Sequence, residues 1–505
     1  MAITPGRNPN SLLALILPSE LQANQFAVTE KGKEWPLYKF LRAPSAIEEL
    51  KPYSTGQGGV LVWMDNGTLA YINNGGRFPP PTRFAKFFDL HSGVCIRILG
   101  DSDDAILETA TFFGALESFQ KQIEISYKHN LDFDDARAEQ LALIMDKNQT
   151  RKICFIGAKL NSAVSAMIAT RPYPINLYLE NASIDDDAFL KHFQGRTTPF
   201  GSLSSEKSLA TSLFKTIFHQ LNLFEHFRVN RLPNDLILQL LSASVKSVGF
   251  TVGDENKDLD LMAADIVPKD IRIQTLYEAF PSTFMLSFLR RVAQLGHVES
   301  LELSLHEHDP IPVEVGMALL GLLGASKNLK SLKLPVSVDA LDDQFIKDLF
   351  DVIEKHDRLT VFSITAYPTK LDPQFKWLKH LMQRNRRVHV TDNHGTNWKY
   401  DRELEKIYAL NRFLHGSHMV TKEPLSIRTL VLGTALTYGA VNHFQRAASL
   451  LADQADILCE ILHEIDLANE AHDDSSLLKR KADDDDDEGN PADPELGPRR
   501  KRQWK

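Results

Sequence analysis

The chain has 505 residues, of which 43% are hydrophobic, and a formal net charge of −9 at pH 7. The apolar fraction is ample for a large core, while the acidic surplus argues against general affinity for nucleic acid or a membrane surface. The three cysteines, Cys95, Cys154 and Cys459, are far apart and odd in number, which indicates a reducing compartment rather than a disulfide scaffold.

Residues 1–95 are expected to form a small N-terminal capping region that contains a β-hairpin. Two apolar runs, 60–64 and 68–72, flank Asp65-Asn66-Gly67, a sequence that favours a tight hairpin turn. The prolines of residues 78–81 indicate a rigid connector rather than a polyproline ligand.

The apolar run at residues 12–17 is too short for the core of a secretory signal, and no small-residue cleavage pattern follows it. No segment approaches the ~20 apolar residues that a membrane-spanning helix requires. We therefore expect neither secretion nor a membrane partner.

A short apolar phrase recurs through residues 96–396. It places two apolar residues one apart, the alternation of a strand with one buried face, ahead of a longer segment with apolar residues three and four apart. The three central copies are Val298-x-x-Leu301-x-Leu303, Leu329-x-x-Leu332-x-Leu334 and Leu359-x-x-Phe362-x-Ile364. Twelve pairs, at intervals of 21 to 31 residues, begin at Ile96, Ile123, Ile153, Leu177, Leu203, Phe227, Val248, Ile271, Leu301, Leu332, Phe362 and Val388.

The segments between the phrases are predicted to be helices, which gives one strand and one helix per unit. Residues 342–353 place Phe345, Leu349, Val352 and Ile353 on one helical face. Asp372-Pro373 is predicted to supply an N-cap and a proline at the first helical position.

This pattern resembles the leucine-rich-repeat superfamily, specifically the long-repeat class typified by ribonuclease inhibitor. The resemblance covers about residues 96–394 and implies an α/β fold, a curved solenoid of strands and helices. The family phrase continues to an Asn or Cys at the turn. The equivalent positions here are His306, Ser337, Tyr367 and Asn393, of which only Asn393 fits, so we expect an irregular arc of degenerate repeats. An ordinary α/β domain with a parallel sheet is the alternative.

Residues 397–470 are predicted to be a helical C-terminal cap, because a stacked array needs an atypical unit to cover its last apolar face. A second helical stretch is expected at about 443–467, and a separate partner-binding helical domain is the alternative. One amphipathic face is formed by Leu404, Ile407, Tyr408, Leu410 and Leu414.

Residues 471–505 are predicted to be a disordered tail, since they have few apolar residues and their charges are sorted into blocks. An acidic run, 483–488, separates two basic clusters that resemble a bipartite nuclear localisation signal. The resemblance implies a nuclear import receptor as a partner and a nuclear location, with the cytoplasm as the alternative. Nuclear import is favoured, and a solvated tail or a weak nucleic-acid-binding arm is the alternative. The basic clusters are Lys479, Arg480 and Lys481, and Arg499, Arg500, Lys501 and Arg502.

Motifs for catalysis, a cofactor or a metal are weak. The cluster His306-Glu307-His308-Asp309 lacks the helical spacing of a zinc site, and Asp185-Asp186-Asp187 precedes a helix whose dipole it complements. The glycine pairs lack the lysine of a phosphate-binding loop. We therefore predict a non-enzymatic protein with no cofactor.

The expected function is that of a scaffold or adaptor that binds a macromolecular partner on the inner face of the solenoid. Residues between the buried positions of each strand must point to that face. A protein partner is favoured. A substrate-recognition subunit of a ubiquitin ligase is one alternative, and a nucleic-acid-associated protein is possible but not favoured. The predicted partner-binding residues are Glu302, Ser304, Lys333, Ser363, Thr365, Arg387 and His389.

Overall fold

The structure is a computed structural model with two compact units, residues 1–398 and 399–505. It describes residues 12–22, 25–26, 28–30, 33–54, 59–74, 83–127, 131–206, 217–275, 280–305, 311–335, 343–365, 367–368, 372–393, 395–398 and 402–420.

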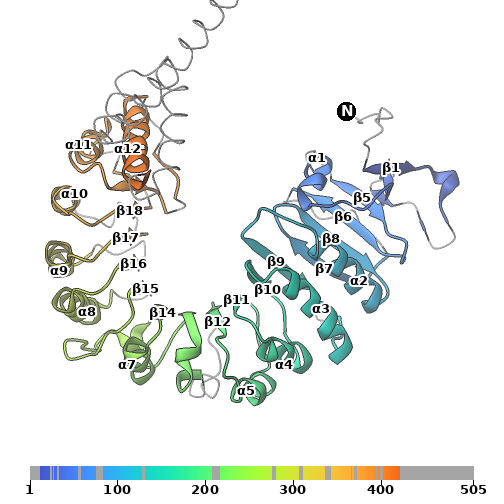
Figure 1. The fold of residues 1–505 in the computed structure, drawn as a ribbon, viewed down its shortest axis with the longest axis horizontal. Coiled ribbons are helices and arrows are strands. Elements are labelled where there is room, and N and C mark those ends of the chain that lie inside the picture. Colours follow the sequence, from blue (N-terminus) through green and yellow to red (C-terminus); the bar gives the residue numbers. More distant parts are fainter. Residues whose placement is uncertain are drawn as a thin grey trace, which may run out of the picture. The chain divides into compact units, whose positions relative to one another are not determined.

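A ladder of parallel strands forms most of the first unit. Each strand pairs in parallel with the next along the chain. In the described part of this unit, these strands line the inner side of a curve, and the sheet does not close (Figure 1). The strands are β9 (Gln122–Tyr127), β10 (Lys152–Ile156), β11 (Ile175–Glu180), β12 (Gly201–Ser205), β13 (Phe224–Arg228), β14 (Ser247–Val252), β15 (Asp270–Thr275), β16 (Ser300–Ser304), β17 (Ser331–Leu334), β18 (Val361–Ile364) and β19 (His389–Thr391).

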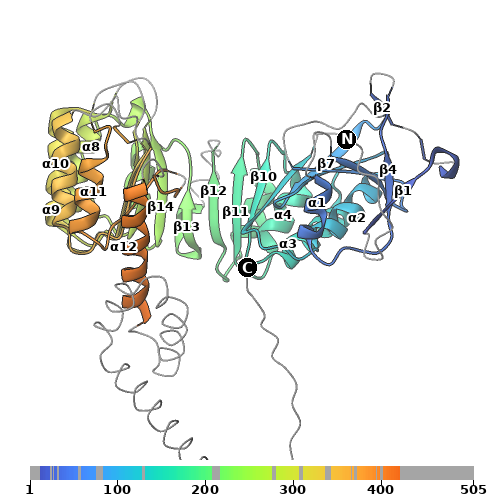
Figure 2. The ribbon, with the colours of Figure 1, turned by 90° about the horizontal axis from the view of Figure 1, so that it is seen from above.

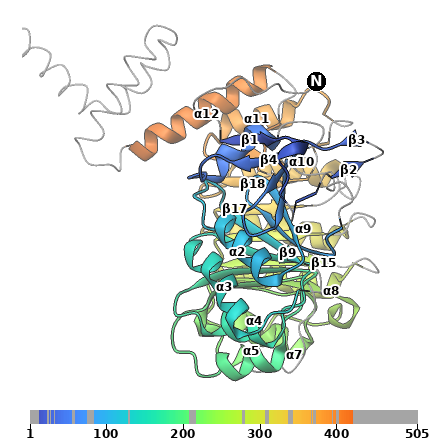
Figure 3. The ribbon, with the colours of Figure 1, turned by 90° about the vertical axis from the view of Figure 1, so that its right-hand side faces the viewer.

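Helices cover the outer side of this ladder (Figure 1). Figure 3 shows α2 to α5 following one another along that outer side. The helices are α2 (Asp103–Gly114), α3 (Asp135–Lys147), α4 (Ser162–Thr170), α5 (Asp186–Phe193), α7 (Asn234–Ser242), α8 (Ser282–Leu295), α9 (Val313–Ala325), α10 (Asp343–Glu354) and α11 (Lys376–Arg384). The described chain therefore alternates strand and helix as a repeat solenoid does, with one exception. The helix predicted between β14 and β15 is absent, because residues 253–269 contain only the 3-10 helix Asp254–Asn256.

The core lies between the sheet and the helices, and one buried residue per strand aligns with its neighbours. The pairing runs without a break from Ile123 to Phe362 through the ten positions predicted from the phrase. All ten side chains are buried. This confirms the predicted register over that span.

The prediction is wrong at both ends of the set. Phe362 pairs with Val390, whereas Val388 is buried just before β19, so the last phrase starts two residues later. Asn393 is then not the equivalent of Tyr367.

Ile96 lies in β8 (Cys95–Gly100), which pairs antiparallel with β7 (Lys86–His91). Only three residues join β7 to β8, too few for a parallel crossover, and alternation alone carries no information about strand direction.

The N-terminal strands extend the same sheet with mostly antiparallel pairs. The apolar run of residues 12–17 contains β1 (Leu13–Ile16), which pairs antiparallel with β4 (Leu37–Phe40). β5 (Val60–Trp63) and β6 (Leu69–Asn73) pair antiparallel across the Asp65-Asn66-Gly67 turn. The short elements of this region are β2 (Thr29–Glu30), β3 (Lys33–Glu34) and α1 (Lys51–Ser54).

Two helices differ in detail from their predictions. α10 buries Ile346 and Phe350 more deeply than Phe345, since Phe350 packs edge-on against Phe362 of β18 whereas Phe345 lies against Gly316 of α9. α11 begins at Lys376, after Phe375 in a left-handed conformation, rather than at Pro373. The Asp372 carboxylate still serves this helix, because it accepts a hydrogen bond from the backbone N–H of Trp377 at 2.8 Å.

Hydrogen bonds at the helix C-termini join one repeat to the next. The side-chain amide of Asn385, at the end of α11, donates to the carbonyls of Ile353 and His356 near the end of α10, at 2.9 and 3.0 Å. His356 in turn donates to the Ser326 carbonyl after α9 at 2.9 Å. Buried polar groups from neighbouring repeats thereby satisfy carbonyls that the helices leave unpaired.

The second unit is described only over α12 (Arg402–Val420). Leu404, Ile407 and Tyr408 are buried there as the amphipathic pattern predicts, while Leu410 is half-buried. The Leu414 side chain, the expected helix at 443–467 and the tail lie outside the described residues. Among the helices that are described, none combines the length and apolarity needed to cross a membrane.

Candidate binding hollow on the inner face

The inner face of the ladder carries polar side chains because each strand turns its alternate residues toward the helices. Figure 2 shows β10 to β14 side by side. One line of residues runs in register across the ladder, and its members on the seven strands from β11 to β17 are called the central row. It consists of Tyr178, Ser204, Arg228, Gly249, Arg272, Glu302 and Lys333.

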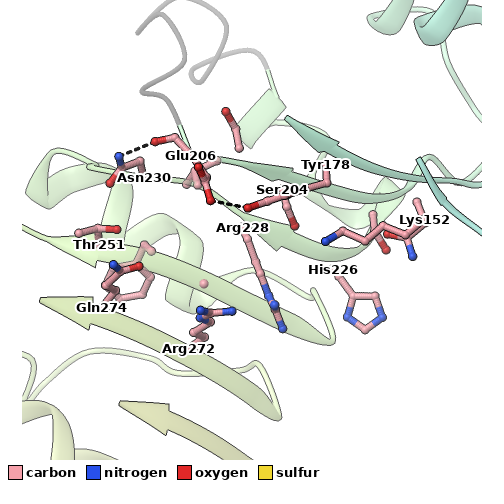
Figure 4. A pocket seen from close by; sticks show the side chains of 16 residues that line it. Lys152, Tyr178, Ser204, Glu206, His226, Arg228, Asn230, Thr251, Arg272 and Gln274 are labelled. Carbon is pink, nitrogen blue, oxygen red and sulfur yellow. Dashed lines mark hydrogen bonds between the residues drawn. The ribbon is translucent and has the colours of Figure 1, made fainter. Parts of the chain in front are cut away.

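The inner face is hollowed over β10 to β15, where an open cavity of about 660 Å³ lies above the sheet. Arg228 and Arg272 come into it from β13 and β15, and Lys152 and Tyr178 from β10 and β11 (Figure 4). His226 lies beside Arg228 in the neighbouring line of residues. The hollow thus collects cationic and hydrogen-bonding side chains from strands more than 100 residues apart in sequence.

Arg228 lies at the centre of this hollow. Its buried Nε–H has no hydrogen-bond acceptor among the described residues. Burial, and then the charge of Arg272, lower the pKa of Arg228, although an arginine remains charged at neutral pH. A desolvated cation without a carboxylate partner is energetically costly, so this side chain is placed where an anion would stabilise it.

Arg272 has a different environment. Its Nε lies 3.0 Å from the Glu302 carboxylate, whose other oxygen lies 3.9 Å from the Lys333 ammonium group. Glu302 is the most buried of the three, with a side-chain exposure of 18%. The Glu302 carboxylate therefore lies close to two cations of the central row, Arg272 and Lys333.

Gly249 separates the two arginines in the central row. A Cβ atom at this position would lie 2.9 Å from Cγ of Arg228 and 3.4 Å from Cβ of Arg272. The first distance is too short for any ordinary contact, so a side chain at residue 249 would force Arg228 to move. The glycine is what allows both arginines to extend over the sheet.

The other side chains of the hollow are more constrained. The Tyr178 hydroxyl donates a hydrogen bond to the Glu206 carboxylate, and burial together with that bond raises the pKa of Tyr178. The Lys152 ammonium group lies 3.8 Å from the centre of the Tyr178 ring, a cation–π contact. Burial lowers the pKa of His226, which favours a neutral imidazole in the hollow.

The predicted partner-binding residues are placed unevenly. All but Thr365 and Arg387 lie on strands of the ladder, and Glu302 and Lys333 join Arg272 in the central row. Ser363 lies in β18 and pairs with Lys333, but it is buried and donates to the Asp392 carbonyl at 2.6 Å. Thr365 follows β18, and Arg387 precedes β19 and donates to the Asp357 carbonyl at 2.9 Å.

Sequence reasoning missed the residues that form the hollow, above all Arg228 and Arg272. The signal was present, because each arginine follows a buried residue of the phrase, Phe227 or Ile271, and so belongs to the inner face. The hollow itself depends on which strands lie side by side and on Gly249, which no single repeat reveals.

The other motifs have structural roles or lie outside the described residues. Asp185 caps α5 by accepting from the Ala188 N–H at 3.0 Å.

Cys95 and Cys154 are free thiols, and burial raises the pKa of each to about 11, so neither is a thiolate at neutral pH. The described residues contain no cluster of metal-ligating side chains. The cluster at 306–309, Cys459 and both basic clusters of the tail fall outside them.

Comparison with protein-family models and with curated protein sequences finds no match, so the functional argument rests on the geometry of the inner face.

Proposed function

We propose that this chain is a non-enzymatic scaffold or adaptor, a leucine-rich-repeat-like solenoid that binds a protein partner on its inner face. The observation that carries the proposal is the in-register ladder from β9 to β19. With neighbouring strands ~4.8 Å apart, it offers a face roughly 50 Å long, which suits a macromolecule better than a metabolite.

The charges of this face favour a protein over a nucleic acid. Glu124, Glu180, Glu206, Asp270 and Glu302 are interspersed with the cations along the strands. A polyanion would meet these carboxylates on either side of the arginines, and like charges at an interface are repulsive. A protein surface of mixed charge meets the same pattern without that penalty.

We also propose the nucleus as the place of action, with an import receptor as a second partner. The two basic clusters at 479–481 and 499–502 support this proposal, since extended cationic side chains can pair with acidic grooves of such receptors.

The proposal is tested with two triple variants that alter charge by the same amount. The inner variant is Glu302→Lys, Lys333→Glu and Arg387→Glu. The outer variant is Lys347→Glu, Asp351→Lys and Lys376→Glu, at exposed positions of α10 and α11. A partner is first identified by affinity purification and mass spectrometry and then purified.

Calorimetric titration of this partner should give at least about tenfold weaker binding to the inner variant and unchanged binding to the outer one. Circular dichroism verifies that both variants are folded. Equal affinities of the parent and the inner variant would contradict the proposal.

A further inference from the structure

Arg228 and Arg272 are presented to the same hollow, but their charges are not balanced there. Arg228 has no ion-pair partner among the described residues, and Arg272 shares Glu302 with Lys333. The central row therefore carries three cations, Arg228, Arg272 and Lys333, for one carboxylate. Over the seven strands of the central row this leaves an excess of two positive charges. The next carboxylate of the same line, Glu124, lies two strands beyond Tyr178.

We infer that Arg228 and Arg272 anchor a phosphate monoester, carried by the protein partner as a phosphorylated side chain. The inference rests on the proposed function, because the partner supplies the group. A phosphate monoester has a charge between about −1.5 and −2 at pH 7 and three acceptor oxygens. That charge matches the excess on the row, whereas a carboxylate would offset only half of it.

The donors around Arg228 also fit such a group. A guanidinium presents a planar fork of N–H groups that bonds two phosphate oxygens at once. Figure 4 shows both arginines extending from their strands over the same part of the sheet, with His226 nearby. Ser204 is paired with Arg228 in the central row and lines the hollow, so its hydroxyl is a neutral donor there.

A phosphodiester chain fits less well. Each of its groups carries one charge, and neighbouring groups would extend along a face that also carries Glu206 and Asp270. The Glu302 and Asp270 carboxylates are close enough to Arg228 to raise its pKa, against the larger lowering by burial. The site is suited to one concentrated dianion rather than to a row of single charges.

The test uses three biotinylated peptide libraries of random flanking sequence, with a fixed phosphoserine, glutamate or serine at the centre. Binding to the full chain is measured by biolayer interferometry at pH 7.5. The phosphoserine library should bind at least about tenfold more tightly than the glutamate library, and the serine library should be weakest.

Three variants separate charge from geometry. Arg228→Gln should remove the preference for phosphoserine. Arg228→Lys keeps the charge but loses the fork, and should weaken binding in part. Gly249→Ala keeps every charge and forces Arg228 to move, so it should also weaken binding. Arg386→Gln, at an exposed residue before β19, removes one charge outside the hollow and should have no effect.

The inference is overturned if the glutamate library binds as tightly as the phosphoserine library, if Arg228→Gln binds like the parent while its thermal melt shows it folded, or if single-stranded RNA binds more tightly than the phosphopeptides. A purified partner distinguishes this failure from failure of the proposed function. If the partner binds the parent equally well after phosphatase treatment, and binding is still weakened by the inner triple variant, only the phosphate anchor is contradicted. A partner insensitive to the inner triple variant would contradict the proposed function.

Discussion

Arg228 and Arg272 lie on either side of Gly249 in one line of the sheet, yet they are stabilised differently. Arg272 forms an ion pair with Glu302 at 3.0 Å, whereas the buried Nε–H of Arg228 has no acceptor in the described residues. A buried donor left unpaired costs about 1–3 kcal/mol, and more if it is charged. The fold thus places a buried donor without an acceptor in the hollow of the inner face.

The repeat register predicts which side chains hold the ladder together. Leu332 is fully buried and pairs in register with Leu301 and Phe362. Leu332→Ala should lower the free energy of unfolding by about 2 to 5 kcal/mol, because it removes a core side chain and leaves a cavity. Urea denaturation measures this change. The neighbouring Lys333→Ala is the control, and a Leu332→Ala curve that overlays the parent would refute the register.

A backbone position gives an independent check. Gly201 has a φ of +98°, and a Cβ atom there would lie 2.6 Å from the Ile175 carbonyl oxygen. Gly201→Ala should therefore destabilise the chain by about 1–3 kcal/mol or more, since a non-glycine residue is strained in that conformation. Gly195→Ala meets no atom within 4 Å and should be nearly neutral. Thermal melts of the two variants are compared, and equal melting temperatures would refute this account of Gly201.

The residues before three successive strands form an ion-pair bridge with a predictable pH dependence. Glu299 accepts from Lys269 at 2.9 Å and from Lys330 at 2.5 Å, and these bonds lower its pKa from 4.5 to about 2. The folded state therefore binds the proton more weakly than the unfolded state. The stabilisation is complete above pH 4.5 and is lost as the pH falls toward 2.

Glu299→Gln should make the free energy of unfolding fall less steeply as the pH decreases from 4.5 toward 2. Urea denaturation at pH 6, 4.5 and 3.5 in low salt measures it, because salt screens exposed pairs. Glu314→Gln, an exposed glutamate on α9, serves as control. A parent and a Glu299→Gln variant with parallel pH profiles would show that the bridge contributes nothing.

The fold was predictable from the sequence where one physical signal repeats. Alternation fixed the buried residue of each strand from Ile123 to Phe362, because exposing those side chains would be costly. It could not give the direction of the strand at Ile96, or the two-residue offset at Val388, where Val390 alternates equally well. Predicting the hollow requires knowing which strands are neighbours in the sheet. Arg228 is identified as a site residue only from the structure, where Gly249 and Arg272 lie beside it.

The location of the protein is a separate prediction, based on the basic clusters of residues 479–481 and 499–502. Replacing both clusters with alanine should shift a fluorescent fusion from the nucleus to the cytoplasm, because cationic side chains are what acidic receptor grooves bind. Replacing Asp483 to Asp487 with serine should have a smaller effect. A parent fusion that remains cytoplasmic while nuclear export is blocked would contradict nuclear import.

The most direct test of inner-face binding is hydroxyl-radical footprinting of the full chain with and without its purified partner. Tyr178 and His226 report on the hollow, while Met317 on α9, with an exposure of 67%, and Phe119, with 90%, report on other surfaces. Inner-face binding predicts that the partner reduces oxidation of Tyr178 and His226 and leaves Met317 and Phe119 unchanged. Protection of Met317 with unchanged oxidation of Tyr178 and His226 would place the partner on the helices and contradict the proposed function.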